Sequence, residues 1–215
     1  FLDTTASHPA EPGWCVLLEN SDHESEAHAR EQFERLLEAA MDQGCVMDAV
    51  VAENLAQAAA LWHIRESIPL AQAQEGLNIK HDISIPVSSI PEFVQVTDQL
   101  LQQAVPDVRL VNFGHLGDGN LHYNVFPPQG EDRATWAGHA PAVTRAVHDL
   151  VHEHGGSISA EHGIGRLKRG ELERCKDPLE LELMRRLKAA LDPAGILNPG
   201  VIMGMPDAPT PGEIS

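Results

Sequence analysis

An Asp-Gly pair at residues 118–119 separates two strand-like runs of the chain, RLVNF (109–113) and LHYNVF (121–126). Asp-Gly between such runs is a strong signal for a β-hairpin with a two-residue loop. The chain is therefore expected to contain an antiparallel sheet. The loop also predicts the cross-strand pairs Gly117–Asn120, Leu116–Leu121 and His115–His122.

The predicted pairing places two imidazoles side by side. Directly opposed residues share one face of a sheet, with Cβ atoms about 4.5 to 5.5 Å apart. His115 and His122 could then converge on one metal ion, with Asn124 on the same face. Histidines near a hairpin tip are more often merely solvated, and a metal site needs a third ligand.

The segment SISAEHGIGRLKRG (157–170) offers a candidate for that ligand. It places Glu161 and His162 directly after a short predicted strand, where a carboxylate ligand and a titratable base often occur together. Two histidines and one carboxylate leave coordination positions open for water or substrate, as in catalytic metal sites.

A second group of histidines lies in HDLVHEHGG (148–156). His148 and His152 are one helical turn apart, a spacing that zinc sites use. Near a helix C-terminus, however, histidines more often lie on a solvated face, where the helix dipole favours positive charge. We therefore expect these residues to be solvated.

Strand and helix patterns alternate along the rest of the chain. NIKHDISIPV (78–87) alternates isoleucines with the polar residues Lys80, Asp82 and Ser84, which is typical of a half-buried strand. Ser21 with Glu24, and Ser89 with Glu92, have the spacing of capping boxes that begin helices. Other strands are expected at 14–20, 45–52 and 157–160, and other helices at 54–67, at 141–154 and from Asp177 to Leu191.

This order of elements favours an α+β fold with ferredoxin-like β-α-β units, in which helices pack on one face of an antiparallel sheet. A parallel, doubly wound sheet is the alternative, but the GxGxxG loop of a dinucleotide-binding form is absent from the sequence. We expect residues 14–203 to form the domain, 1–13 to be a linker and 204–215 to be a disordered tail.

Net charge, cysteine content and hydropathy limit the partners and the compartment that we expect for this chain. The formal net charge is −17, which disfavours nucleic acid and anionic membranes, because both require a basic face. The three cysteines are far apart and form no CxxC pair, so a reducing cytoplasm is the expected compartment. The sequence contains no apolar run long enough to span a bilayer.

Three segments in register resemble the C-terminal substrate domain of FAD-linked oxidases of the D-lactate dehydrogenase, glycolate oxidase flavin subunit and D-2-hydroxyglutarate dehydrogenase family. They are GHLGDGNLHYN (114–124), SISAEHGIGRLKR (157–169) and LDPAGILNPGVI (191–202). LWHIRESI (61–68) and KHDISIPVS (80–88) also fit. The resemblance implies a domain that binds a small 2-hydroxy acid beside FAD, which an N-terminal FAD-binding domain would hold.

The resemblance also implies roles for individual residues. In the metal-dependent members it implies that His115, His122 and Glu161 bind a divalent metal, usually zinc, and that His162 is the catalytic base. The remaining roles implied are substrate binding by Arg65, Lys80 and Asn124, and a flavin contact by Asn198.

The chain departs from the family pattern at two positions. Val201 replaces the lysine of the family's NPGK motif, which weakens the case for a flavin contact there. Pro69 lies where some 2-hydroxyglutarate enzymes have a hydroxyl residue, which disfavours that substrate. No flavin-binding half precedes these residues, so we expect a C-terminal part that is inactive alone; a homodimer is also compatible with the resemblance.

Three hypotheses about function remain at this point. The first is the substrate- and metal-binding half of an FAD-dependent 2-hydroxy acid dehydrogenase that transfers hydride to flavin. The second is a flavin-independent metallohydrolase, in which the same two histidines and glutamate hold a metal-bound water. The third is a non-catalytic ferredoxin-like module that binds small acids or a partner subunit.

Overall fold

The computed structural model describes residues 13–204 of the chain. It divides into two compact units, Phe1–Gly76 and Leu77–Ser215. The predicted linker and tail therefore lie outside the described residues, except for Gly13 and Gly204.

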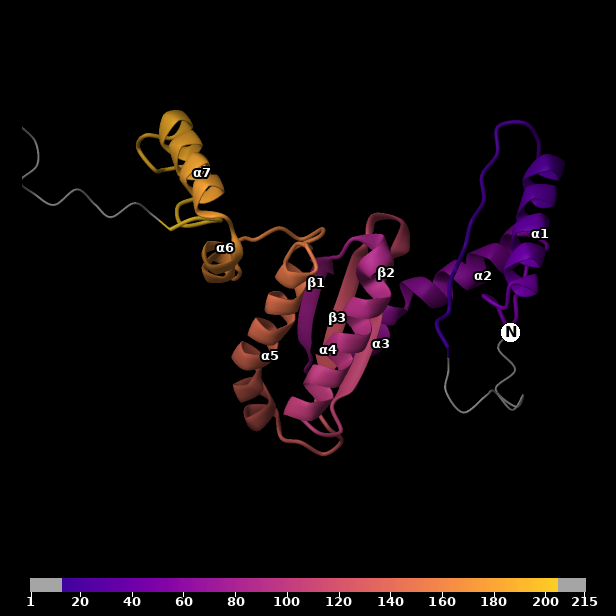
Figure 1. The fold of residues 1–215 in the computed structure, drawn as a ribbon, viewed down its shortest axis with the longest axis horizontal. Coiled ribbons are helices and arrows are strands. Elements are labelled where there is room, and N and C mark those ends of the chain that lie inside the picture. The colour runs from indigo at the N-terminus through magenta and orange to yellow at the C-terminus, as the bar shows by residue number, and fades with distance from the viewer. Residues whose placement is uncertain (1–12, 205–215) are drawn as a thin grey trace, which may run out of the picture. The chain divides into compact units, whose positions relative to one another are not determined.

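The described part of the first unit is helical. It contains α1 (Glu26–Asp42), α2 (Leu55–Glu66) and α3 (Ile68–Glu75) (Figure 1). Pro69 lies in the first turn of α3, where its missing N–H costs no helical hydrogen bond, so α2 ends before it as predicted. The predicted capping box at Ser21 is wrong: Ser25 caps α1, and its side chain accepts a hydrogen bond from the His28 amide.

The strands predicted at 14–20 and 45–52 are also wrong. Within residues 13–76 the structure has helices and irregular chain but no strand. Short apolar runs satisfy the side-chain pattern of a strand, but a strand also needs a neighbouring strand to accept its backbone hydrogen bonds. Neither run finds such a neighbour in the described part of this unit.

The second unit contains the predicted antiparallel sheet. Its strands are β1 (Ile79–Ser84), β2 (Arg109–His115) and β3 (Asn120–Phe126), in the spatial order β1-β3-β2. Its other elements are two 3-10 turns, η1 (Val87–Ser89) and η2 (Leu116–Asp118), and the helices α4 (Ile90–Ala104), α5 (Arg133–Glu153), α6 (Arg169–Cys175) and α7 (Pro178–Leu191).

The expected fourth strand is reduced to one bridge. Ser157 pairs with Ser84 at the free edge of β1 through amide–carbonyl hydrogen bonds of 3.0 and 2.8 Å. With this bridge the element order is β-α-β-β-α-β, which is the ferredoxin-like arrangement. The predicted α+β class, with an antiparallel sheet and helices on one face, is therefore confirmed.

The apolar face of the sheet lies under α4 and α5, which pack against each other (Figure 1). Ile83, Tyr123 and Val125 are fully buried there, because alternate residues of β1 and β3 point to the same side. From the helices, the most deeply buried apolar side chains of the core are Phe93, Leu101, Trp136, Val147 and Val151.

Two details of these helices differ from the sequence expectation. The Ser89 side chain makes no capping hydrogen bond, because a 3-10 turn precedes α4 and places Ser89 in a helical conformation. The helix predicted at 141–154 begins at Arg133, since Asp132 caps it by accepting the amides of Ala134 and Thr135, and Pro141 lies within the helix.

The opposite face of the sheet is polar. It carries Lys80, Asp82 and Ser84 from β1 and Asn120, His122 and Asn124 from β3, as the pairing of the two strands requires. The predicted alternation in β1 is therefore confirmed, and this face carries the candidate site.

Candidate functional site

The hairpin that carries the two predicted histidine ligands has a different register from the one expected. His115 pairs with Asn120, and His122 pairs with Phe113. The predicted direct pair of His115 with His122 is wrong, because the loop contains four residues, a 3-10 turn followed by Gly119 with φ of +73°. The register differs by two residues, an even number, so both histidines still lie on the same face of the sheet.

Contact with the segment after β1 explains the longer loop. The amide of Ile85 donates a 2.9 Å hydrogen bond to the Gly119 carbonyl. A Cβ atom on Gly119 would lie 2.1 Å from the Ile85 carbonyl oxygen, so this approach requires glycine. The Asp-Gly pair is thus a turn signal, as predicted, but a neighbouring segment determines which turn forms.

The loop that carries Glu161 and His162 is held against β1. The Ser84–Ser157 bridge begins it, and the Ala160 amide donates to the Asp82 carbonyl at 3.3 Å. The ammonium group of Lys168 donates to the carbonyls of Ile158 and Asp82, at 2.8 and 3.3 Å. Residues almost eighty positions apart in the sequence therefore meet on the polar face.

Glu161 reaches the hairpin. Its Oε1 accepts a 2.5 Å hydrogen bond from Nδ2 of the buried Asn120 and lies 3.4 Å from Nδ1 of His115. The carboxylate and the imidazole are both largely exposed. Two of the three predicted metal ligands are thus adjacent, with room for further groups around them.

His122 lies beside His162 instead. The centroids of the two rings are 6.1 Å apart, and the His122 ring also contacts Phe113, with centroids 4.8 Å apart. Nδ1 of His122 is 4.0 Å from Oδ1 of Asp82. The four predicted metal and base residues therefore form two adjacent pairs on one face of the sheet.

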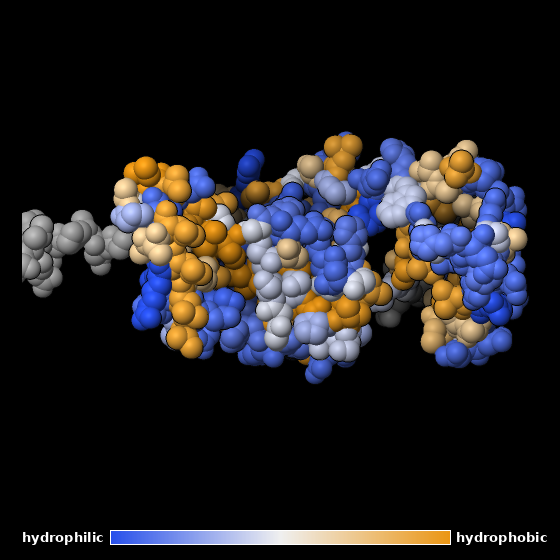
Figure 2. Space-filling view, turned by 90° about the horizontal axis from the view of Figure 1, so that it is seen from above, coloured by the Kyte–Doolittle hydropathy of each residue, from blue (hydrophilic) through white to orange (hydrophobic). Residues whose placement is uncertain are grey.

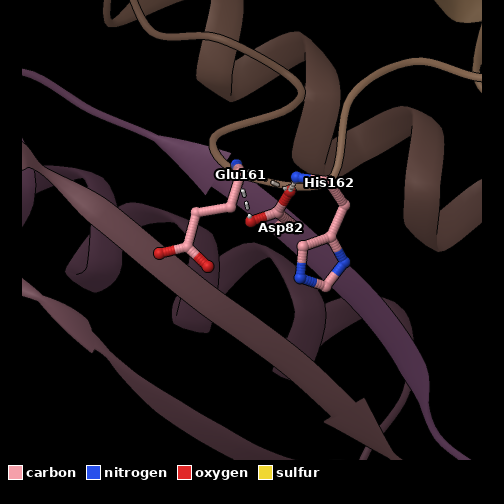
Figure 3. A group of neighbouring side chains, drawn as sticks. All are labelled: Asp82, Glu161 and His162. Carbon is pink, nitrogen blue, oxygen red and sulfur yellow. Dashed lines mark hydrogen bonds between the residues drawn. The ribbon is translucent and has the colours of Figure 1, made fainter.

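A residue that the sequence did not single out lies at the centre of this group. Asp82 is 7% exposed, and its carboxylate accepts the backbone amides of Glu161 and His162 at 3.1 and 2.9 Å (Figure 3). Burial raises the pKa of the Asp82 carboxyl, but the hydrogen bonds from the two amides, together with the nearby side chains of His162 and Lys168, hold the pKa below its usual value. Asp82 is therefore an ionised, buried acceptor. The alternation of β1 places it on the polar face, which is the signal in the sequence that could have drawn attention to it.

The residues fit a divalent cation by their chemistry and spacing. Within residues 13–204, one group of three His, Cys, Asp or Glu residues has ligand atoms that all lie within 4.8 Å of one another: Asp82, Glu161 and His162. The predicted set of His115, His122 and Glu161 is not such a group, although His115 and Glu161 already meet. Imidazole nitrogens and carboxylate oxygens are ligands that zinc accepts.

A small hollow opens beside these residues. It has a volume of about 200 Å³ and is lined by Ser84, Asp118, Asn120, Ser159, Ala160 and Glu161. Sites for drug-sized ligands usually measure roughly 300 to 1,000 Å³. The hollow is therefore smaller than such sites, and Asp118 and Glu161 make its lining acidic.

The residues predicted to bind substrate and flavin lie on several elements. Lys80 pairs with the buried Asn124 on the polar face, and Lys80 itself is exposed. Arg65 is half-buried on α2 of the first unit. Asn198 is exposed in a turn after α7, with φ of +47°, and its carbonyl accepts the Val201 amide at 3.2 Å.

The structure places the three helical histidines in different surroundings. His148 is buried and lies 3.0 Å from a carboxylate oxygen of Glu171, so the prediction that it is solvated is wrong. His152 is exposed, as predicted, and His154 is half-buried with Nδ1 2.8 Å from the Leu150 carbonyl. His148 connects α5 to α6, a role that helical spacing alone does not indicate.

Comparison with known proteins agrees with the resemblance. A D-2-hydroxyglutarate dehydrogenase of Xanthomonas citri pv. viticola is 42% identical over 189 residues, which are 88% of this chain and 39% of that protein. One from Stutzerimonas stutzeri is 40% identical over 182 residues, 83% of this chain and 39% of that protein. A mitochondrial D-2-hydroxyglutarate dehydrogenase of Arabidopsis thaliana is 35% identical over 184 residues, 86% of this chain and 31% of that protein.

The chain therefore spans less than half of the length of these relatives. In the part of the chain that the structure describes, no helix is long and apolar enough to cross a membrane. A family model described as the C-terminal domain of FAD linked oxidases matches residues 2–202, almost the whole sequence. On this match, and on its likeness to the relatives, the chain belongs to the family of FAD linked oxidase C-terminal domains.

Proposed function

We propose that this chain is the substrate- and metal-binding part of an FAD-dependent dehydrogenase that oxidises a D-2-hydroxy acid. The observation that carries the proposal is the meeting of two segments on the polar face. It brings Glu161 to within 3.4 Å of His115, and it places His162 beside His122. Family membership supports the reaction class. The names of the relatives support 2-hydroxyglutarate as the substrate, against the expectation drawn from Pro69.

The family resemblance favours His115, His122 and Glu161 as the metal ligands; the structure brings His115 and Glu161 together, while His122 lies beside His162. When bound, a divalent ion such as zinc would act as a Lewis acid and lower the pKa of the substrate hydroxyl. Asn120 helps to prepare this site, because its amide holds one oxygen of Glu161 and so limits the positions that the carboxylate can take. Hydrogen bonds of this kind keep a ligand in place before the ion arrives.

The substrate would lie against the polar face, with its carboxylate toward Lys80. Lys80 is paired with Asn124, which is buried, so the two lie side by side on this face. The ammonium group of Lys80 supplies positive charge, and the amide of Asn124 supplies a hydrogen-bond donor with a defined direction. Substrate binding by Arg65 stays a prediction from the family resemblance. In an acidic protein with a formal net charge of −17, such local cations are needed to bind an anion.

His162 would act as the base. An imidazole nitrogen of His162 would take the proton of the 2-hydroxyl group, and the exposure of this residue leaves it open to a ligand. FAD would accept the hydride that leaves the carbon bearing that hydroxyl. Most contacts to FAD would come from an N-terminal FAD-binding domain, and the exposed amide of Asn198 suits a hydrogen bond to the flavin.

For the compartment we propose a reducing one, the cytoplasm in the first instance. Cys15, Cys45 and Cys175 are all free thiols in the structure, which is the state that a reducing compartment maintains. Two of the relatives, from Arabidopsis thaliana and Rattus norvegicus, are named as mitochondrial.

Zinc binding tests the site directly. Titration calorimetry on the 215-residue chain should show one zinc ion bound per chain. His115→Ala should weaken its affinity by at least about tenfold, because one of three protein ligands is lost. His152→Ala is the matched control, since His152 is an exposed histidine on α5 outside the site, and it should bind zinc like the wild type.

Two results would count against the proposal. Zinc affinity that is the same in His115→Ala and the wild type would remove His115 from the site. Hydrolysis of an ester or amide by the metal-loaded chain, with no 2-hydroxyglutarate-dependent reduction of a dye by the FAD-containing protein, would favour the metallohydrolase.

A further inference from the structure

Asp82 connects the two segments that supply the site. It lies in the middle of β1, paired with His122 of β3, and its side chain is on the polar face. Its backbone carbonyl accepts the Ala160 amide and the Lys168 ammonium group, each at 3.3 Å. One residue thus contacts the strand that carries His122 and the loop that carries Glu161 and His162.

The carboxylate of Asp82 fixes the backbone of that loop. Oδ2 accepts the amides of Glu161 and His162 at 3.1 and 2.9 Å, and Oδ1 also lies 3.4 Å from the Glu161 amide. Figure 3 shows the result: the two side chains leave the loop on either side of the Asp82 carboxylate. Without these hydrogen bonds the loop would be adjustable, because Gly163 and Gly165 follow directly, both with positive φ.

The same carboxylate faces the His122 ring. Oδ1 is 4.0 Å from Nδ1 of His122. A carboxylate on this side favours the tautomer with the proton on Nδ1 and leaves Nε2 to bind a metal. The Asp82 carboxylate therefore contacts or faces all three site residues: it faces the ring of His122 on β3, and it accepts the amides of Glu161 and His162 in the loop.

We propose that Asp82 is a positioning residue, which sets the Glu161–His162 turn and the His122 ring in the arrangement that binds the metal and the substrate. This inference rests on the proposed function. In this role Asp82 acts through three other residues, His122, Glu161 and His162.

The test uses Asp82→Asn in the full 215-residue chain, because asparagine has nearly the same size but lacks the charge and one acceptor oxygen. Two quantities are measured, the hydrogen exchange of the Glu161 and His162 amides by NMR and the zinc affinity by calorimetry. We expect both amides to exchange roughly tenfold faster or more, and zinc to bind roughly 10- to 100-fold more weakly.

Asp132→Asn is the matched control. Asp132 is also an aspartate whose carboxylate accepts two backbone amides, those of Ala134 and Thr135 at 2.9 and 3.1 Å, at the start of α5. Its substitution should leave the exchange of the Glu161 and His162 amides and the zinc affinity at their wild-type values.

The outcomes separate the two proposals. If the wild type binds zinc but Asp82→Asn leaves either quantity unchanged, the positioning role is overturned and the metal site stands. If the wild type binds no zinc, the metal site fails, and amide exchange alone decides whether Asp82 sets the turn. If Asp82→Asn does not fold, hydrogen exchange in the wild-type chain is the test. Glu161 and His162 amides that are protected from exchange support the inference, and amides that exchange at random-coil rates overturn it.

Discussion

His81 and Asp82 are neighbours in β1 whose side chains point to opposite faces of the sheet. Asp82 lies on the polar face, while His81 is buried in the core and its Nδ1 lies 2.8 Å from the Tyr123 carbonyl. Its Nδ1 must therefore carry the proton, and its buried Nε2 has no hydrogen-bond partner among the described residues. The rings of Tyr123 and His148 pack edge-on against it. A charged imidazole would be costly in this place.

This burial makes the stability of the chain depend on pH. Burial lowers the pKa of His81 from 6.5 to about 4, so between these values the unfolded chain binds the proton more readily than the folded chain. The contribution of the neutral His81 to the free energy of unfolding is thus fully present above about pH 6.5. It is lost as the pH falls to about 4, and the total loss is roughly 3 kcal/mol.

Chemical denaturation at a series of pH values checks this prediction. The free energy of unfolding of His81→Gln should fall less steeply between pH 6.5 and 4, because the glutamine amide can donate to the Tyr123 carbonyl but does not titrate. His152→Gln, an exposed site, should keep the wild-type slope. An equally steep slope in His81→Gln would show that another group causes the loss.

At single residues, the sequence indicated candidate side chains but not the backbone contacts that hold them. Glu161, His162, His115 and His122 were identified because their side chains carry recognisable chemistry, and the structure places all four on or beside one face. Asp82 was not identified, because its partners are backbone amides 79 and 80 positions away. Every residue has an amide, so no sequence pattern marks which amide a carboxylate will hold.

At the level of elements, the hairpin shows how tertiary contact selects a turn. The strands β2 and β3 were predicted because their alternation and the Asp-Gly pair are local features. The four-residue loop was not, because it depends on the approach of Ile85 to Gly119 from the segment after β1. The strands expected at 14–20 and 45–52 show the same limit, since strand formation depends on a partner that a single run does not specify.

The two glycines of this loop should respond differently to substitution. Gly119→Ala adds a Cβ 2.1 Å from the Ile85 carbonyl at a positive φ, which should lower the free energy of unfolding by about 2 kcal/mol or more. Gly117→Ala is the control, since its Cβ would meet nothing within 4 Å, and it should change stability by less than about 1 kcal/mol. Urea denaturation measures both, and equal effects of the two substitutions would disprove the role of the Ile85 contact.

At the level of the whole molecule, α7 shows that the chain leaves much apolar surface uncovered. Four of its five leucines recur every four residues, the spacing that predicted the helix, yet these four, Leu179, Leu183, Leu187 and Leu191, are 67%, 49%, 62% and 81% exposed. Figure 2 shows hydrophobic side chains gathered on the surface of the C-terminal helical part. Exposed apolar patches usually mark interaction sites. Since the chain spans 39% of a relative's length, we expect other residues of a longer protein to cover this stripe.

Substitution of one leucine in two contexts tests this expectation. In the 215-residue chain, Leu187→Lys should change the free energy of unfolding by no more than about 0.5 kcal/mol, because the side chain is already exposed, and it should reduce binding of a hydrophobic dye. In the FAD-containing protein the same substitution should lower the melting temperature, because a lysine would then be buried without a partner. Ala189→Lys, which adds the same charge on the other side of α7, controls for charge in both contexts. A melting temperature that Leu187→Lys lowers no more than Ala189→Lys does would mean that the stripe stays exposed in the longer protein.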